Sequence, residues 1–302
     1  MRPSQPVHVA LLGCTAAWGL VFIGVHELLP VLDSTQIVTL RFAIISAVVV
    51  VALVARPELR PRFSRREWPV VVVCAVLAVP ATQLCIVYGQ QFLSPPLASL
   101  VVTTSPAFAA VMAASLLGER IGVTQVAGLG LALVGVAVVV GIGAGHGSDV
   151  AVKEALPATV AILTPVAWAV YTVMSKPLAA RHGATGAVGV TLVVGTIFLL
   201  PFAFHSVDAA VRLDLSSWLW LGYLAVGGTV VPYTIWFASL RTLPASKTAA
   251  YMYLIPAFAL GWTLLLLHQA PRAAALAGGV LVVGGVALAQ FGSPPVVTAP
   301  AE

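Results

Sequence analysis

Polar and aromatic side chains recur at helical spacing within the apolar stretch 155–176. They lie four, three and four residues apart and are Thr164, Trp168, Tyr171 and Ser175. This spacing places them on one face of a helix. Hydroxyl groups and ring faces on one side of an apolar helix suit a ligand pocket, because a few polar groups fix the orientation of a small molecule there. We therefore predict that this face lines a cavity for a zwitterionic or aromatic metabolite.

Similar side chains in other apolar stretches complete a predicted substrate-binding set. Thr229, Tyr233 and Trp236 form a second polar and aromatic stripe in the stretch 216–238. The full set comprises Trp18, Arg41, Gln83, Ser99, Thr103, Trp168, Tyr171, Tyr233, Trp236 and Tyr251. These residue types also have a structural alternative. Serine and threonine in membrane helices often donate to a carbonyl of the preceding turn, and tryptophan and tyrosine often form belts at the membrane interface.

Arg41 is a charged side chain inside the apolar stretch 35–55. A charge at the centre of a membrane helix costs roughly 2.5–3.5 kcal/mol on insertion scales, so such a residue usually faces the protein interior or a water-filled cavity. Its guanidinium presents a fixed fork of donors that suits a carboxylate. The alternative is a structural role, in which the side chain reaches the outer interface or ties down a helix end. The sequence leaves both interpretations open.

Four residues are predicted to act in gating or in structure. Pro106 and Pro256 are expected within helices, where each proline leaves one backbone carbonyl without its partner and forms a flexing point or a kink. Glu119 is expected to cap the helix that follows it or to pair with Arg120, with proton transfer as the alternative. Lys247 is expected at the cytoplasmic start of a helix, where it anchors the chain or meets an anion entering from the cytoplasm.

Three glutamines, Gln83, Gln90 and Gln91, belong to the apolar stretch 68–90 and its outer end. Only Gln83 is placed deeply enough to require a buried partner. No Asp or Glu lies deep in any apolar stretch, and Glu27 at the outer end of the first stretch is the nearest candidate for proton coupling. We therefore favour facilitated export or exchange over a dedicated proton relay.

The composition places all of these residues in a membrane protein. Apolar residues make up 60% and charged residues 8% of the 302 residues, and the mean hydropathy is +1.04. Soluble domains carry about a quarter charged residues. Stretches long enough to cross a bilayer recur along the chain, and we predict ten of them, at 8–26, 35–55, 68–90, 95–117, 121–142, 155–176, 186–204, 216–238, 245–267 and 272–291. The predicted fold is an all-α membrane protein with ten transmembrane helices.

Several classes of function are disfavoured by what the sequence lacks. No phosphate-binding loop of the Gly-x-x-x-x-Gly-Lys-Ser/Thr type occurs, which argues against an ATP-driven pump. The six histidines lie at the ends of apolar stretches or between them, and the three cysteines are scattered within them, so neither a catalytic set nor a metal site is expected. We predict no enzyme activity, no cofactor and no nucleic-acid partner.

Two parts of the chain match at a constant offset of 150 residues. The matches are Pro106–Ala109 with Pro256–Ala259, Trp18 with Trp168, and Trp68 with Trp218. An offset that holds along the whole chain indicates duplication of one half-length unit. Glycines recur at the same offset, and we interpret the glycine-rich stretches 121–142 and 272–291 as scaffold helices, with homodimer contact as a second use.

We assign the first five-helix repeat to 8–142 and the second to 155–291, joined by a linker at 143–154. A repeat with an odd number of spans must insert in the opposite orientation in its second copy. The halves are then inverted repeats related by a two-fold axis in the membrane plane, an arrangement typical of secondary transporters. The loop 56–66 holds five arginines, which places this loop and both termini in the cytoplasm and the chain in the cell membrane.

Several short motifs occur in a fixed order, namely Trp18-Gly19, Arg41-Phe42, Ala98 ahead of Pro106, Gly118-Glu119, Gly128 and Gly135. In this order and with the duplicate spacing, the sequence resembles the EamA family of the drug/metabolite transporter superfamily. The resemblance implies two EamA units in a ten-helix carrier that exports or exchanges small metabolites, such as amino acids, without ATP. The second half departs from the pattern, because Thr191 aligns with Arg41 and Gln269 with Glu119. We therefore expect the halves to be functionally unequal.

The combined prediction is a secondary transporter that exports or exchanges a small metabolite, an amino acid or a related compound, by alternating access. Substrates of the sugar-phosphate, nucleotide-sugar or drug type within the same superfamily are the alternative. A membrane partner without transport activity is the third hypothesis. The expected partners are a small-molecule metabolite and the lipid bilayer.

Overall fold

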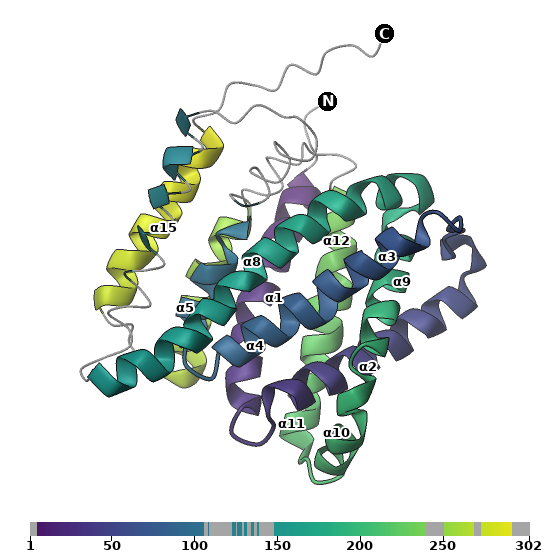
Figure 1. Ribbon diagram of the computed structural model, residues 1–302, viewed down its shortest axis with the longest axis horizontal. Coiled ribbons are helices and arrows are strands. Elements are labelled where there is room, and N and C mark those ends of the chain that lie inside the picture. Colours follow the sequence, from purple (N-terminus) through teal and green to yellow (C-terminus); the bar gives the residue numbers. More distant parts are fainter. Residues whose placement is uncertain are drawn as a thin grey trace.

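The computed structural model of the chain consists of helices joined by turns and short loops in the residues that it describes (Figure 1). These are residues 5–105, 108, 123–124, 126–128, 130–131, 134–135, 138, 148–239, 251–268 and 273–291. The all-α prediction is confirmed for these residues. Three of the predicted gating residues, Pro106, Glu119 and Lys247, lie outside them, so the roles predicted for these three stay predictions.

The first half of the chain contains four helical segments within the described residues. They are α1 (Gln5–Leu28), α2 (Ser34–Ala55), a segment that runs from α3 (Trp68–Val76) through the π-helix η2 (Leu77–Leu84) to α4 (Cys85–Gly89), and α5 (Pro95–Val102). The short 3-10 helix η1 (Pro57–Leu59) lies in the arginine-rich loop after α2.

The second half begins with α8 (Ser148–His182), which starts earlier than the predicted span 155–176 and includes part of the predicted linker. The elements that follow are α9 (Ala184–Ile197), η3 (Leu200–Phe202), α10 (Ala203–Ala210), α11 (Leu215–Gly222), η4 (Tyr223–Val230), α12 (Val231–Ser239), η5 (Tyr251–Leu254), α14 (Ile255–Trp262), η6 (Thr263–Leu267) and α15 (Ala273–Phe291). Of these, η4 and η6 are π-helical, whereas η3 and η5 are 3-10 helices.

Several of the described helices are suited to cross a membrane. Four are long and apolar enough by themselves, namely Pro6–Leu28, Ser34–Ala55, Trp68–Gly89 and Leu215–Trp236. The pair Ala184–Ile197 and Leu200–Ala210, bent by 50°, adds a fifth span if the two helices are counted as one. Shorter apolar helices occur at Val160–Ser175, Tyr251–Leu267 and Leu276–Gly285. These helices agree with a multi-pass membrane protein, whereas the count of ten spans stays a prediction.

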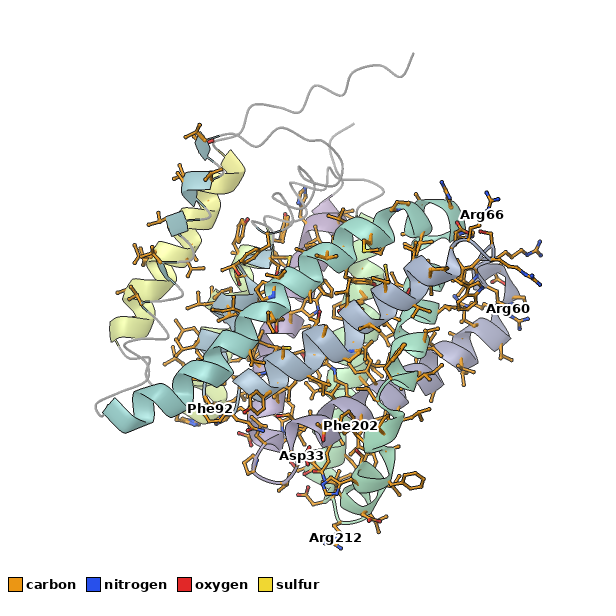
Figure 2. All side chains as sticks on the ribbon, in the orientation of Figure 1. Asp33, Arg60, Arg66, Phe92, Phe202 and Arg212 are labelled. Atoms are coloured by element: carbon orange, nitrogen blue, oxygen red, sulfur yellow. The ribbon has the colours of Figure 1, made fainter. Side chains whose placement is uncertain are left out.

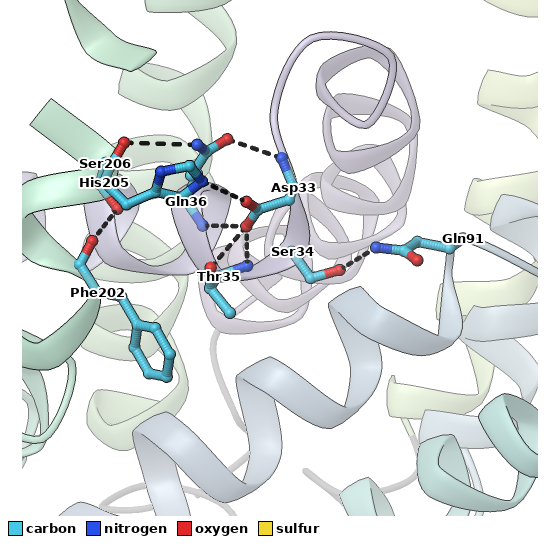
Figure 3. Close-up of polar contacts among 8 residues, drawn as sticks. All are labelled: Asp33, Ser34, Thr35, Gln36, Gln91, Phe202, His205 and Ser206. Atoms are coloured by element: carbon cyan, nitrogen blue, oxygen red, sulfur yellow. Dashed lines mark hydrogen bonds and ion pairs between the residues drawn. The ribbon is translucent and has the colours of Figure 1, made fainter. Parts of the chain in front are cut away.

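The start of α2 is fixed by a capping box (Figure 3). The Asp33 carboxylate accepts from the backbone N–H groups of Thr35 and Gln36 at 2.8 and 2.9 Å. In return, the Gln36 side-chain oxygen accepts from the Asp33 N–H at 2.9 Å. Such caps satisfy N–H groups that a helix leaves unpaired at its start. The same carboxylate lies 3.3 Å from His205 Nε2 on α10, so the two halves of the chain meet at this end of α2.

The two halves pack against each other through equivalent helices. The helix α2 lies against α9, where the Ser46 hydroxyl donates to the Thr196 hydroxyl at 2.8 Å across 150 residues of sequence. In the same way, α1 packs against α14 and α12, and its counterpart α8 packs against α5 and α4. At the level of whole predicted spans, these contacts recur in both halves, which agrees with two repeats of one unit. The inverted orientation of the second repeat stays a prediction.

Glycines make the closest helix contacts. A Cβ added at Gly19 of α1 would lie 2.8 Å from the backbone nitrogen of Ala259 on α14. A Cβ added at Gly135, in the glycine-rich stretch 121–142, would lie 2.7 Å from the backbone nitrogen of Val282 on α15. Small residues allow such approaches between membrane helices. Gly135 therefore serves a contact within one chain, and homodimer contact by these stretches stays a prediction.

Pro256 lies in the first turn of α14, directly after the 3-10 helix η5. Tyr251–Leu267 is one apolar helical segment, so Pro256 lies within it. Pro256 marks the change from 3-10 to α geometry in this segment. Its predicted role as a flexing point or kink stays a prediction.

Candidate functional site

A cavity of about 100 Å³ is lined by helices of both halves. Its walls come from α1, α2, η2, α4 and α5 of the first half and from α8, η4, α12, η5 and α14 of the second. The lining residues are Trp18, Val21, Phe22, Val25, Arg41, Thr82, Gln83, Ile86, Val87, Gln90, Val102, Thr164, Trp168, Gly228, Tyr233, Met252 and Ile255. A mostly apolar lining with a few polar groups is the usual composition of a small-molecule site.

Five of the ten predicted substrate-binding residues line this cavity, namely Trp18, Arg41, Gln83, Trp168 and Tyr233. They come from α1, α2, η2, α8 and α12, so the fold brings together residues that are far apart in the sequence. Trp18 and Trp168 hold equivalent positions in the two repeats. The cavity thus receives one tryptophan from each half.

Arg41 is the charged residue of the described lining, and its side chain is almost fully buried, with 4% exposure. Nε donates to the Leu224 carbonyl at 3.2 Å, Nη1 to Gln83 Oε1 at 3.2 Å and Nη2 to the Thr229 hydroxyl at 2.7 Å. All three acceptors are neutral, and Arg41 forms no ion pair with any described residue. The side chain therefore points into the protein, where it ties α2 to η4 and also borders the cavity.

The segment that Arg41 contacts is π-helical and has a counterpart in the first half. In η4 the Thr229 hydroxyl donates to the Leu224 carbonyl at 2.9 Å. In η2 the Thr82 hydroxyl donates to the Leu77 carbonyl at 2.6 Å, again five residues back. Both leucines begin a Leu-Ala-Val sequence. π-Helical segments are frequent at functional sites, and these two face one cavity from opposite halves.

The halves differ in how these segments are held. Arg41 of α2 reaches across to η4 and donates to both the carbonyl of Leu224 and the hydroxyl of Thr229. Thr191, the equivalent residue of α9, is too short for such a reach, and its hydroxyl donates to the Ala187 carbonyl within its own helix at 2.8 Å. The loss of the arginine in the second repeat thus makes the two sides of the cavity chemically different.

Aromatic rings form one wall of the cavity. The Tyr233 ring lies between Trp18 and Trp168, edge to face with both, at centroid distances of 6.2 and 5.6 Å. Trp236 lies 5.2 Å from Trp18, and Tyr171 lies 5.5 Å from Trp168. Trp236 and Tyr171 are not among the lining residues. Their place is therefore beside the lining tryptophans, whose ring orientations they help to fix.

The remaining predicted substrate-binding residues make other contacts. The hydroxyls of Ser99 and Thr103 donate to the carbonyls of Pro96 and Ser99 at 2.6 and 2.7 Å, which is the structural alternative for such residues. The Tyr251 hydroxyl is hydrogen-bonded to the His8 ring, and the two rings are stacked. The structure places none of these three predicted residues at the cavity.

Comparison with known proteins identifies the family. The EamA-like transporter family matches residues 5–141 and again residues 156–291. The chain belongs to the EamA-like transporter family. The resemblance inferred from the short sequence motifs is thereby confirmed. Membership makes this EamA-like chain a multi-pass membrane transporter and not an enzyme.

Curated relatives are similar to this EamA-like transporter over most of its length. It is 27% identical over 242 residues to the "Probable terminal-alkyne amino-acid exporter" of Streptantibioticus cattleyicolor, a match that covers 80% of each chain. It is 25% identical over 291 residues to the "Probable amino-acid metabolite efflux pump" of Salmonella typhimurium, covering 91% of each chain. A protein of known crystal structure, 20% identical, shares the fold with a TM-score of 0.64 over 96% of this chain and 98% of its own.

Two polar residues that line this EamA-like transporter's cavity, Thr82 and Gln90, are absent from the predicted set. Gln90 is predicted at the outer end of its span without a buried role, yet it lines the cavity and is 5% exposed. Its separation of seven residues from Gln83 corresponds to two helical turns and was a usable signal. The apolar lining residues, such as Ile86 and Met252, gave no signal, because any apolar residue in a membrane span has the same appearance in a sequence.

Proposed function

We propose that this EamA-like transporter exports or exchanges an amino acid, or a closely related zwitterionic metabolite, across the cell membrane by alternating access. The proposal rests on the burial and the hydrogen-bond partners of Arg41. This residue is a buried cation at the edge of the cavity, and its hydrogen-bond partners among the described residues are all neutral. A carboxylate entering the cavity would give this cation the counter-ion that it lacks.

The energetics favour such a ligand. Moving a charge out of water costs several kcal/mol even after relaxation, and neutral acceptors offset only part of that cost. Arginine has five N–H donors, of which Arg41 uses three in the contacts described. The two that remain are available to a carboxylate, and hydrogen bonds between a guanidinium and a carboxylate are among the strongest in proteins.

The names of the relatives support the same substrate class. Two of them are named as an amino-acid exporter and an amino-acid metabolite efflux pump. The aromatic wall formed by Trp18, Trp168 and Tyr233 suits an apolar or aromatic side chain on such a substrate. One buried cation matches one carboxylate better than it matches the doubly charged phosphate of the alternative substrates.

Alternating access is supported by the reciprocal packing of the halves. Inverted repeats move against each other around a substrate site at their interface, and the cavity of this chain is lined by both halves. The crossing of α2 and α9 at Ser46 and Thr196 joins residues that are equivalent in the two repeats, as expected for a point on a two-fold axis. We place both termini in the cytoplasm, on the basis of the arginines in the loop 56–66.

The motive force in this proposal is the substrate gradient or exchange. No Asp or Glu is among the lining residues in the described part of the chain, so the cavity offers no carboxylate there to carry a proton. The membrane-embedded charge is a permanent cation, because arginine does not deprotonate in proteins. Transport is therefore expected to continue when the proton gradient is collapsed.

The test is uptake and counterflow of labelled amino acids by proteoliposomes containing the purified chain. Wild type is expected to show saturable flux that an excess of unlabelled amino acid on the opposite side accelerates. Arg41→Met should reduce flux at low substrate roughly tenfold or more, since a hydrogen bond to a charged group contributes about 1.5–3 kcal/mol. Arg41→Lys should also lose activity because it lacks the fork of donors.

Arg212→Met provides the control for this test. Arg212 lies in the exposed turn between α10 and α11, so its replacement removes a positive charge without touching the cavity. Full flux is expected in this variant. Absence of amino-acid counterflow by wild type, or unchanged flux in Arg41→Met, would contradict the proposal.

A further inference from the structure

The cavity contains a second polar group whose bonding is incomplete. Gln90, at the end of α4, is 5% exposed, and its side-chain oxygen is enclosed without a hydrogen-bond partner in the described chain. Buried side-chain oxygens almost always have a partner, because an unpaired one loses its hydration without compensation. Since Gln90 also lines the cavity, a ligand bound there can supply the hydrogen-bond donor that this oxygen lacks.

The other two glutamines of this segment show what is special about Gln90. The Gln83 side-chain oxygen, two helical turns earlier, already accepts from Arg41. Gln91, the next residue along the chain, is exposed and donates to the Ser34 hydroxyl at 2.7 Å at the start of α2 (Figure 3). Of these three glutamines, Gln90 alone both lines the cavity and has a buried side-chain oxygen without a hydrogen-bond partner among the described residues.

We propose that the side-chain oxygen of Gln90 accepts a hydrogen bond from the ammonium group of the bound amino acid, while Arg41 holds the carboxylate. This assignment rests on the proposed function. The two groups suit opposite ends of a zwitterion, because Arg41 supplies only donors and Gln90 supplies an unused acceptor. The rings of Trp18 and Trp168 line the same cavity and offer the ammonium group a favourable ring face.

A neutral amide oxygen is sufficient at this position. A buried carboxylate would bind an ammonium group more strongly, but it would carry its own desolvation cost when the cavity is empty. An amide carries a smaller desolvation cost, so the empty cavity is less destabilised by an amide than by a carboxylate. Sites that pair their buried polar groups with a substrate reject analogues that leave those groups unpaired.

The test compares matched ligand pairs that differ only in the ammonium group. The pairs are L-leucine with 4-methylpentanoate and L-phenylalanine with 3-phenylpropanoate, and binding to the purified full chain in nanodiscs is measured by calorimetry. In wild type each amino acid should bind more tightly than its deamino partner. In Gln90→Leu, affinity for the amino acids should fall about tenfold or more, whereas affinity for the deamino acids should not change.

Two controls separate this effect from a general loss of structure. Gln91→Leu makes the same substitution one residue later, outside the cavity, and should leave all four affinities unchanged. Gln90→Leu removes an unpaired buried polar group, so its ligand-free melting temperature should equal or exceed that of wild type. If it unfolds instead, Gln90→Met replaces it in the same comparison.

The outcomes are distinguishable. If wild type discriminates between the members of each pair and Gln90→Leu does not, the assignment is supported. If both ligands of a pair lose affinity equally in Gln90→Leu, or neither does, the ammonium contact is refuted while amino-acid binding stands. If wild type binds no amino acid of the panel, the proposed function fails and the assignment fails with it.

Discussion

At the scale of single residues, Glu67 joins the loop before α3 to the end of α8. One oxygen of its carboxylate lies 3.0 Å from His182 Nε2 and accepts from Arg181 at 3.4 Å. The other accepts from the backbone N–H and the hydroxyl of Ser64 at 2.8 and 2.9 Å. These contacts, led by the Ser64 N–H, lower the pKa of Glu67 from 4.5 to about 2. Hydrogen bonds to the charged form of a carboxylate have this effect.

The lowered pKa of Glu67 predicts how stability depends on pH. A carboxyl group with a depressed folded-state pKa contributes stability above its unfolded-state value, and loses it as the pH falls through the folded-state value. The contribution is therefore complete above about pH 4.5 and is lost between there and about pH 2. Glu67→Gln should lower the melting temperature of the detergent-solubilised chain at pH 7, and the gap from wild type should narrow as the pH approaches 3.

Glu58→Gln is the matched control, since Glu58 lies in the same loop and makes no hydrogen bond or ion pair with the described residues. Its melting temperature should follow that of wild type at every pH. A gap between wild type and Glu67→Gln that stays constant from pH 7 to pH 3 would show that the lost contact is not the ionised carboxylate.

The sequence revealed single residues when their chemistry conflicted with the membrane. Arg41 was found because a charge inside an apolar stretch requires an explanation, and the structure gives it a buried network. The prediction for Ser99 and Thr103 was not supported, because a hydroxyl group in a helix can donate to a carbonyl of the preceding turn as readily as it can face a cavity. The burial of Gln90 does not follow from its position near the end of a span, because the packing of neighbouring helices decides burial.

At the scale of elements, the contact between α1 and α14 depends on Gly19. Its Cα faces the backbone of α14 so closely that an added Cβ would lie 2.8 Å from the Phe258 Cβ and from the Ala259 nitrogen. The indole N–H of Trp262, also on α14, donates to the Ala16 carbonyl at 3.0 Å beside this point. A backbone atom cannot move aside as a side chain does, so the two helices would have to separate.

We therefore expect opposite effects from alanine at two glycines of α1. Gly19→Ala should destabilise the chain by about 1–3 kcal/mol, the usual cost of overpacking. Gly13→Ala should be neutral or stabilising by up to about 1 kcal/mol, because alanine is the better helix former and nothing lies within 4 Å of the added Cβ. Unfolding in a mild denaturant series measures both. Equal stability of the two variants would contradict the close packing of α1 on α14.

The existence of the helices could be predicted from the sequence more readily than their ends. Long apolar stretches predicted α1, α2 and the segment Trp68–Gly89 to within a few residues. The start of α2 also carried a local signal, because Asp33 and Gln36 have the spacing of a capping box. No local signal in the sequence indicated the early start of α8, because the helix begins before the apolar stretch 155–176 from which the span was predicted.

At the scale of the whole molecule, the arginine-rich loop after α2 and the turn after α10 lie apart. Figure 2 shows Arg60 and Arg66 at the right side of the molecule, whereas Arg212 lies at its lower edge. The arginine-rich loop follows α2 in the first half, and Arg212 lies in the turn that follows α10 in the second. The proposed inverted relation between the halves predicts such a separation, because it places equivalent loops on opposite sides of the membrane.

The duplication of the two halves was visible in the sequence as a fixed offset, whereas the full set of residues that line the cavity between them was not. The 150-residue offset identified Trp18 and Trp168 as equivalents, and both line the cavity. Which of the polar residues meet there depends on helix rotation and on the asymmetric reach of Arg41 to η4. Neither the rotation of a helix nor the reach of Arg41 leaves a pattern in a single sequence, because packing against distant segments determines both.

Equivalent positions in the two halves provide a direct test of the inverted arrangement. Arg62 and Arg212 are separated by the repeat offset of 150 residues and are both exposed. Each is replaced by cysteine in a chain whose native Cys14, Cys74 and Cys85 are replaced by alanine. A membrane-impermeant maleimide should label Arg212→Cys in intact cells and Arg62→Cys only after permeabilisation, because the positive-inside rule places the loop 56–66 in the cytoplasm. Labelling of both from the same side would mean that the repeats are parallel, and alternating access between inverted halves would lose its basis.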